Sequence, residues 1–208
     1  MNFITKRNFS HLTPPYIFNR ILVKINQWQY KENPWITSSA SRILDSLLIS
    51  SDIGVEFGSG RSTLRFTQRL KHLISIKKKP LWYFKVKKNL SISKLELKVE
   101  LRLCPEDNDY VSQSLTFDDN SVDFCLIDGA KRDKCALFML LKLRKEGILV
   151  LNNANLFLPN DSTYSPNSRR MKEGFSTETW QQFAEQASKF RRIWTSNGVW
   201  DTAIWIKC

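Results

Sequence analysis

The chain has 208 residues, of which 42% are hydrophobic and 12% aromatic, so it is long and apolar enough to bury one ordinary core. Its formal net charge of +12 predicts an acidic partner, such as nucleic acid, anionic lipid, or a phosphorylated or carboxylated substrate. No apolar run approaches the roughly 20 residues of a membrane span. Residues 1–14 also lack the apolar core of a signal peptide, so we expect a cytoplasmic protein.

The cysteines support a reducing compartment. Their positions do not have the spacing of a zinc site, and we interpret all four as free thiols: Cys104, Cys125, Cys135 and Cys208. Cys125 lies in an apolar run and is expected in the core.

Two helices are expected before the first strand. Residues 15–29 place Ile17, Ile21, Ile25 and Trp28 at helical spacing. This amphipathic helix could pack on the core, which we favour, or lie on a membrane surface. A break at residues 33–35 ends it. Thr37 or Ser38 then caps a second helix, whose expected buried stripe is Ile43, Leu44, Leu47 and Leu48.

The most informative stretch is residues 53–63. The apolar run at 53–57 predicts a short buried strand, and Gly58-Ser59-Gly60 a tight turn. A helical pattern follows, with Ser62 or Thr63 suited to its first turn. Strand, glycine turn and helix N-terminus form a common nucleotide site. Thr63 stands where a dinucleotide fingerprint has its third glycine, which argues against a dinucleotide.

Strands and helices alternate along the rest of the chain. Further strands are expected at 72–76, 99–103, 122–127 and 148–151, with helices from Pro80 and at 135–143, and a loop at 106–120. Residues 154–176 are interpreted as a long loop, either a lid over the site or a disordered insertion. A helical stripe at residues 180–187 and a closing hairpin at 190–206 complete the chain.

This alternation predicts an α/β fold with a mostly parallel sheet and helices on both faces. We expect a single domain, residues 1–208, in which residues 1–50 form N-terminal helices and residues 51–208 the core. Ligands of such sheets bind outside the carboxyl ends of the strands. Five expected strand ends therefore converge on one crevice: Glu56, Lys77, Cys104, Asp128 and Asn152.

Glu56, placed two residues before Gly58, makes the turn more specific. Glu-Phe-Gly-Ser-Gly-Arg-Ser-Thr resembles motif I in a bacterial branch of class I S-adenosylmethionine-dependent methyltransferases. The resemblance implies a Rossmann-like fold with seven strands, the last antiparallel, and S-adenosyl-L-methionine as cofactor. In this family the acid faces the methionine ammonium, often through water, and the glycines line the cofactor. The implied cofactor contacts are Glu56, Gly58, Ser59, Gly60, Ser62, Thr63, Lys77, Cys104, Asp128 and Gly129.

A second resemblance lies after the fourth strand. Residues 128–132 are similar to the Asp-Gly-x-x-Arg of the same branch, and Asp128-x-x-Lys131 also looks like the segment of catechol-type O-methyltransferases that supplies a metal ligand and a lysine base. The resemblance implies Asp128 or Lys131 as catalytic residues and Arg132 as an acceptor contact. Alternatively, Lys131 and Arg132 are solvated residues at a helix start.

The residues after the fifth strand argue against a metal. Metal-dependent relatives have Asp-Asn there, whereas this chain has Asn152-Asn153, and an uncharged amide binds a divalent cation far less well than a carboxylate. Asn152 and Asn153 are therefore expected either to bind the acceptor or to cap the strand end.

Lys77 departs from the family pattern. Class I methyltransferases place an acid there to accept hydrogen bonds from both ribose hydroxyls, and a lysine only donates. Three consequences are open: weaker cofactor binding with another ribose acceptor, an anionic acceptor held by Lys77, Lys78 and Lys79, or loss of cofactor binding.

The leading hypothesis is S-adenosylmethionine-dependent methyl transfer to a small-molecule or anionic acceptor. The second is a non-catalytic relative of the same fold, which Lys77 favours. The third is a nucleic-acid methyltransferase, which rests on basic charge alone and lacks an Asn-Pro-Pro-Tyr-type motif. Steep salt dependence of nucleic-acid binding would favour the third.

Overall fold

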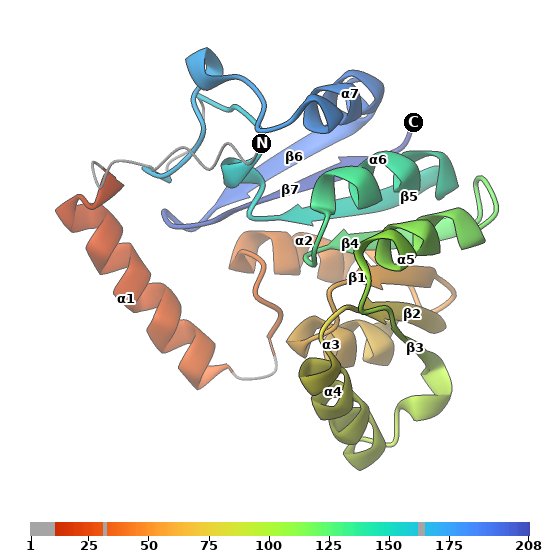
Figure 1. Cartoon of the computed structure of the whole chain (residues 1–208). Coiled ribbons are helices and arrows are strands. Elements are labelled where there is room, and N and C mark those ends of the chain that lie inside the picture. Colours follow the sequence, from red (N-terminus) through yellow and green to blue (C-terminus); the bar gives the residue numbers. More distant parts are fainter. Residues whose placement is uncertain (1–10, 31–32, 162–164) are drawn as a thin grey trace.

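The computed structural model describes residues 11–30, 33–161 and 165–208 (Figure 1). The segment used to argue against a signal peptide lies mostly outside these residues. Two helices come first, α1 (Pro14–Gln29) and α2 (Ser38–Leu47). Thr37 is the N-cap of α2, as predicted, and its hydroxyl accepts a hydrogen bond from the Ala40 N–H.

The core is one seven-stranded sheet in the order β3-β2-β1-β4-β5-β7-β6. Parallel pairing joins β3 through β5, and β7 is antiparallel to both β5 and β6. The predicted methyltransferase-like Rossmann fold is therefore confirmed. The strands are β1 (Ile53–Phe57), β2 (His72–Lys77), β3 (Val99–Leu103), β4 (Val122–Ile127), β5 (Leu143–Asn152), β6 (Arg191–Ser196) and β7 (Asp201–Ile206).

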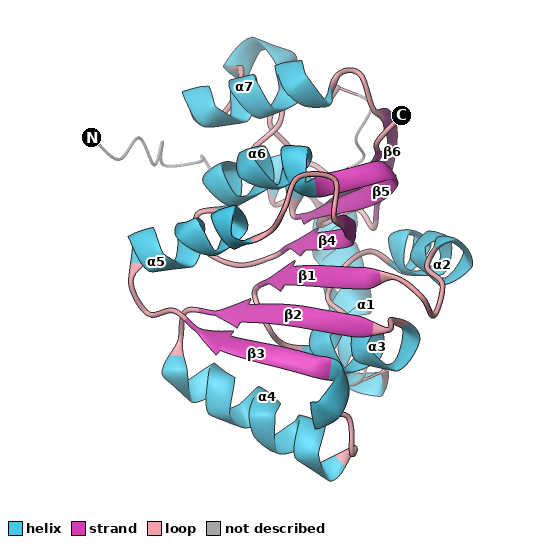
Figure 2. Cartoon of the chain, turned by 90° about the vertical axis from the view of Figure 1, so that its right-hand side faces the viewer, coloured by secondary structure: helices cyan, strands magenta, loops and turns pink. Residues whose placement is uncertain are grey.

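Alternating side chains divide the core into two layers. Leu73, Phe124 and Val150 point toward α2 and α3 (Arg61–Arg69). Phe57 and Leu149 point to the opposite layer, which includes α5 (Asp107–Ser112), α6 (Arg132–Lys142) and α7 (Glu178–Ala187). Figure 2 shows the two layers on either side of the sheet, with α4 (Pro80–Ile92) along the β3 edge. Both faces are apolar because helices cover both faces of the sheet.

Local boundaries differ from the prediction in two places. Residues 106–120 are not a plain loop, because they contain α5 and the 3₁₀ turn Gln113–Thr116. Asp107 and Asp109 suit the positive end of the helix dipole, and buried Tyr110 anchors α5 to the core. The helix predicted at 135–143 begins earlier, at Arg132, and β5 begins at Leu143, five residues before the prediction.

The described part of segment 154–176 is attached to the core and is not a loose insertion, and the lid over the site stays a prediction. Asn155 donates to the Asn167 Oδ1 over 3.0 Å and accepts from the Asp201 backbone N–H over 3.0 Å. Phe157 stacks on Trp180 with ring centroids 5.3 Å apart. Buried polar side chains thus attach the segment to β7, which its polar composition does not reveal.

The favoured placement of the first helix is wrong. In α1 only Tyr16 is buried, while Ile17, Ile21, Ile25 and Trp28 are exposed. In α2 the predicted stripe holds for Leu44 and Leu48, but Leu47 is exposed. Among the described residues, no helix is long and apolar enough to cross a membrane.

Candidate functional site

A cleft of about 700 Å³ opens at the carboxyl ends of β1, β2, β4 and β5. Its volume lies within the range of small-molecule sites. The predicted residues that line it are Gly58, Ser59, Gly60, Ser62, Lys77, Asp128, Gly129, Arg132, Asn152 and Asn153. Four other predicted residues do not line it: Glu56, Thr63, Cys104 and Lys131.

The floor of the cleft is a turn that requires glycine. Gly58 has a φ of +120°, and a Cβ there would lie 2.7 Å from the Asp128 carbonyl carbon and the Gly129 nitrogen. The turn after β1 therefore packs directly on the backbone that leaves β4. Gly60 is different, since the nearest atom to a Cβ there is 3.8 Å away. Gly60 is the N-cap of α3, and its N–H donates to the Thr63 hydroxyl over 2.8 Å.

Glu56 lies beneath the first turn of α3 and is fully buried. Its carboxylate accepts hydrogen bonds from the hydroxyls of Thr63 and Ser75, both at 2.6 Å, and from Ser62. Burial raises the pKa of Glu56, and these three hydrogen bonds oppose the rise. Glu56 therefore joins β1, β2 and α3 and positions the turn, and its place facing the methionine ammonium, often through water, stays a prediction.

Lys77 reaches back from the end of β2 to the glycine turn. Its ammonium donates to the Ser59 carbonyl over 2.5 Å and lies 5.5 Å from the centre of the Trp82 ring. Partial burial lowers the pKa of Lys77, while the carboxylates of Glu56 and Asp128 act in the opposite direction. The position where the family resemblance implies an acid thus carries a cation that lines the cleft.

Lys78 and Lys131 both pair with Asp107, which was not among the predicted site residues. Asp107 of α5 contacts the ammonium of Lys78 and, over 2.9 Å, that of Lys131. Lys131 is exposed, and its ion pair with Asp107 raises its pKa. A base must be neutral to take a proton and must reach the reacting atoms. The geometry therefore argues against Lys131 as the base.

On the opposite wall, Arg132 joins the ends of β4 and β5. Its guanidinium donates to the carbonyls of Asp128, Gly129 and Asn152 over 3.0, 3.0 and 2.6 Å. It also donates to the Asp128 Oδ1 over 2.9 Å and to the Asn153 Oδ1 over 3.1 Å. An arginine has five N–H donors, so these contacts use all of them. Arg132 thus positions Asp128 and the two asparagines at the cleft surface, and its contact with the acceptor stays a prediction.

Asp128 remains the carboxylate best placed for chemistry. Its Oδ1 also accepts from the Asn152 side chain over 3.0 Å. Burial raises the pKa of Asp128, while Arg132, Asn152 and Lys77 oppose that rise. Asn153, at φ +55°, turns the chain as it leaves β5. Asn152 and Asn153 therefore shape this wall and lie at the cleft surface.

The Cys104 thiol does not line the cleft. Cys104 is buried in the core, and burial raises the pKa of its thiol. Its backbone N–H donates to the Lys77 carbonyl over 2.8 Å, which places the backbone and not the thiol near the cleft.

Within residues 11–30, 33–161 and 165–208, no group of three or more histidines, cysteines or acids could hold a metal ion.

Sequence reasoning missed several residues that line the cleft. They come from segments far apart in the chain: Gln27, Trp35, Arg61, Tyr110, Leu156 and Trp200. Trp35 lies under the Arg61 guanidinium at 5.4 Å, and the Arg61 Nη1 donates to the Gln27 carbonyl over 2.9 Å. The Tyr110 hydroxyl would collide with any Cβ at Gly129. Three of these residues are aromatic, but they lie far apart in the sequence, so no periodic pattern could have revealed that they share the cleft.

No protein-family model and no curated protein matches the chain. Solved structures do match, at 12–14% identity, which shows the fold alone. A Streptococcus mutans protein provisionally assigned as a methyltransferase, in complex with SAH, has a TM-score of 0.57, with 81% of this chain and 96% of that chain covered. A SAM-dependent O-methyltransferase from Thermotoga maritima has a TM-score of 0.54, with coverages of 88% and 70%. A methyltransferase from Geobacter sulfurreducens also has a TM-score of 0.54, with coverages of 94% and 89%.

Proposed function

We propose that the protein transfers a methyl group from S-adenosyl-L-methionine to an anionic acceptor. One observation carries the proposal. The glycine turn, Asp128 and Asn152 meet in a single cleft at the carboxyl ends of a sheet whose strand order is that of methyltransferase-like Rossmann folds. The Streptococcus mutans neighbour in complex with SAH supports the choice of cofactor.

The cleft suits the cofactor at the glycine turn. Gly58 brings the backbone to the cleft surface, Gly60 leaves room above it, and α3 offers its N-terminal N–H groups. Ser59, Gly60 and Ser62 would hold the amino-acid part of the cofactor, and Trp82 would flank its base. Lys77 must turn away from the Ser59 carbonyl, which its flexible side chain permits. When bound, the cofactor supplies an electrophilic methyl carbon.

Asp128 is the group that would take the acceptor's proton. Its Oδ1 is held by Arg132 and Asn152, so the carboxylate has a defined orientation toward the cleft. Burial raises its pKa above that of an exposed aspartate, which brings it closer to neutral pH and suits a general base. Arg132 and Asn152 keep this carboxylate in place during transfer.

Three lysines support an anionic acceptor. Lys77, Lys78 and Lys79 line one side of the cleft, and of these Lys78 is paired with Asp107. A phosphate or carboxylate of the acceptor would bind there, opposite Asp128. The bound anion would also neutralise part of the positive charge of these lysines, which would otherwise repel the cationic cofactor.

Calorimetry with S-adenosylmethionine and S-adenosylhomocysteine tests the proposal. We expect micromolar binding to the wild type and at least tenfold weaker binding to Gly60→Val, whose branched side chain would fill the cofactor space without a backbone clash. Absence of binding to the wild type would overturn the proposal. It would instead support the second candidate, a non-catalytic protein of the same fold, which the Lys77–Ser59 contact favours.

Asp128→Asn separates binding from chemistry. The amide keeps the size of the side chain and can still accept from Arg132. Turnover with carboxylated or phosphorylated acceptors should fall by about 10²–10⁴ as expected for loss of a general base. Affinity for S-adenosylhomocysteine should change by less than about threefold, because the base acts on the acceptor. Equal turnover would remove Asp128 from the mechanism.

Removal of metal and the choice of acceptor provide two further tests of the proposal. EDTA should leave turnover unchanged, because Asn152 and Asn153 stand where metal-dependent relatives have Asp-Asn. The third candidate, a nucleic-acid methyltransferase, predicts transfer to RNA or DNA, with binding that weakens steeply as salt rises. Methylation of nucleic acid and not of small anions would favour it.

A further inference from the structure

Helix α1 presents its apolar side chains to solvent. Ile17, Phe18, Ile21, Ile25 and Trp28 are between 47% and 74% exposed. A helix that packs on a core normally buries such a stripe and exposes its polar residues. Burial in this fold therefore does not account for the apolar face of α1.

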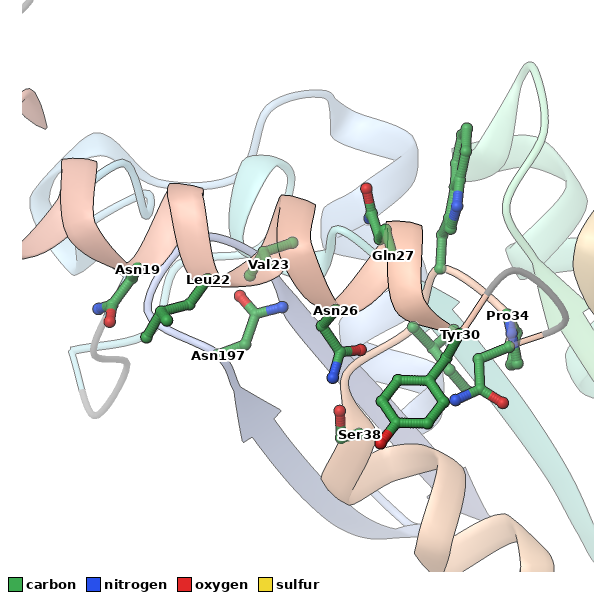
Figure 3. Close-up of a pocket in the computed structure, with 12 residues that line it drawn as sticks. Asn19, Leu22, Val23, Asn26, Gln27, Tyr30, Pro34, Ser38 and Asn197 are labelled. Carbon is green, nitrogen blue, oxygen red and sulfur yellow. The ribbon is translucent and has the colours of Figure 1, made fainter.

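The side of α1 that faces the protein is mixed in polarity. Asn19 and Asn26 line a small cavity of about 210 Å³ together with Leu22, Val23 and Asn197 (Figure 3). Figure 1 shows α1 standing apart from the helices that cover the sheet. The protein-facing side of α1 thus carries polar side chains while most of its large apolar side chains are exposed.

Specific contacts nevertheless define the orientation of α1. At its start, Tyr16 is buried and the Thr13 hydroxyl caps the helix. At its end, the Gln27 carbonyl accepts from Arg61 over 2.9 Å. In between, the Asn19 side chain fills the space beside Gly198, where a Cβ would lie 2.2 Å from its Nδ2. The outward direction of the apolar face is therefore a defined feature of the fold.

Positive charge is concentrated in α1 and in residues 57–95. α1 carries Arg20 and Lys24 and no acid, and residues 57–95 hold eleven lysines and arginines without one aspartate or glutamate. The end of α1 and the start of α4 line the same cleft, through Gln27 and Trp82. α4 also exposes Leu81 and Phe84 beside its lysines. Apolar side chains and cations thus lie together on both sides of the cleft mouth.

We propose that α1 and the start of α4 dock on the surface of an anionic lipid bilayer. Helices with exposed Ile, Phe and Trp beside Lys and Arg lie in the interface, where the apolar side chains enter the acyl boundary and the cations meet lipid headgroups. This docking does not depend on methyl transfer. If the proposed function also holds, the mouth of the cleft opens toward the bilayer, and the acceptor is an anionic lipid headgroup.

The observations favour a bilayer over two other occupants. Nucleic acid would use the lysines but leaves the aliphatic side chains without a partner, since contacts to its backbone are made mainly by polar and charged groups. A second copy would bring two faces together that both carry cations and lack acids, which costs Coulomb energy.

Vesicle sedimentation tests the docking. The wild type should bind phosphatidylcholine–phosphatidylglycerol vesicles at least tenfold more tightly than pure phosphatidylcholine vesicles. Ile21→Asp combined with Ile25→Asp should weaken that binding more than tenfold. The matched control is Leu115→Asp with Leu141→Asp, which changes equally exposed leucines on the other layer and should bind like the wild type. Thermal unfolding of all variants checks that they remain folded.

Charge and position are tested separately. Lys24→Glu with Lys87→Glu should reduce binding at least tenfold, whereas Lys134→Glu with Lys145→Glu makes the same change in net charge on other surfaces and should reduce it less than threefold. Lipids with brominated acyl chains should quench tryptophan fluorescence in the wild type and much less in Trp28→Phe.

Four outcomes would overturn the proposal. The first is equal binding to both vesicle types. The second is unchanged binding in Ile21→Asp/Ile25→Asp. The third is a stable dimer in analytical ultracentrifugation that the same double substitution dissociates, which would assign the face to a second copy. Salt-sensitive binding to DNA or RNA in place of vesicles would assign it to nucleic acid.

Discussion

The two walls of the cleft are built on opposite principles. The wall at β4 and β5 is closed: Arg132 uses every donor on Asp128, Gly129 and the two asparagines, so its charges are matched. The wall at β2, α4 and α1 is open, with an excess of lysines and with apolar side chains in solvent. The closed wall is preorganised for one geometry, and the open wall carries interactions that only a partner can complete.

The difference also appears in the ionisation of the two walls. Burial raises the pKa of Asp128 on the closed wall and lowers that of Lys77 on the open wall, while each charge stabilises the other across the cleft. Removing a group from the closed wall should therefore cost stability. Removing one from the open wall should mainly change binding.

Gly58→Ala should have the largest effect, because Gly58 forms the floor that both walls share. Its φ of +120° disfavours a side chain, and the new Cβ would overlap the backbone at Asp128 and Gly129. We expect a loss of about 3 kcal/mol in the free energy of unfolding, near the upper end for a strained residue. Gly60→Ala is the matched control and should unfold like the wild type in urea. Equal midpoints for both variants would contradict the proposed contact.

Arg132→Lys tests the closed wall. A lysine retains the charge but cannot make the planar, five-donor contact, so carbonyls and the Asp128 carboxylate lose partners. The expected cost is about 2 kcal/mol in unfolding free energy, typical of buried groups left unsatisfied. The control is Arg61→Lys at the start of α3, where Arg61 makes one hydrogen bond among the described residues, to the Gln27 carbonyl. If chemical denaturation shows the same loss for both, the contrast between the walls fails.

Lys77→Glu tests the open wall. The carboxylate would supply a two-oxygen acceptor for the ribose and remove a cation beside a cationic cofactor. Hydrogen bonds to charged groups contribute roughly 1.5–3 kcal/mol, so affinity for S-adenosylmethionine should rise about tenfold or more. Lys79→Glu alters the same net charge farther along the rim and should change the dissociation constant less. Weaker cofactor binding in Lys77→Glu than in the wild type would show that the lysine serves another ligand.

Asp107→Asn should have the smallest effect. It releases Lys78 and Lys131, but both pairs lie near the surface, where solvent screens an ion pair. The free energy of unfolding, measured by urea denaturation, should thus change less than in Arg132→Lys. Affinity for an anionic acceptor should rise, because Lys78 becomes available. A larger loss of stability would mean that α5 depends on this pair.

Local patterns were sufficient where one segment forms one element. Residues 53–63 became β1, the glycine turn and α3 within a residue or two of the prediction, because apolar alternation and glycine conformation act over a few residues. The expected strand ends Lys77, Asp128 and Asn152 also meet in the cleft. Parallel pairing brings carboxyl ends to one edge of the sheet, so their convergence follows from strand order alone.

Sequence patterns did not show the contacts that join distant residues. Glu56, expected to face the cofactor, is covered by hydroxyls from α3 and β2. Arg132, expected either to contact the acceptor or to be solvated, is bonded within its own wall. Lys131, expected either as a base or as a solvated residue, pairs with Asp107, twenty-four residues earlier in the chain. Hydrogen-bond partners at such separations leave no periodic signal in the sequence.

The sequence by itself determined the order of the strands and of every α-helix except α5, the glycine turn at 58–60 and the concentration of positive charge in residues 57–95. Propensity, backbone freedom and charge are properties of short segments. Only the tertiary structure decided that Lys77 lies on the turn, that Arg132 is fully occupied, and that the apolar face of α1 points outward. The reason is geometric: an amphipathic pattern specifies that a helix has an apolar side, but the position of the helix on the sheet decides what that side contacts.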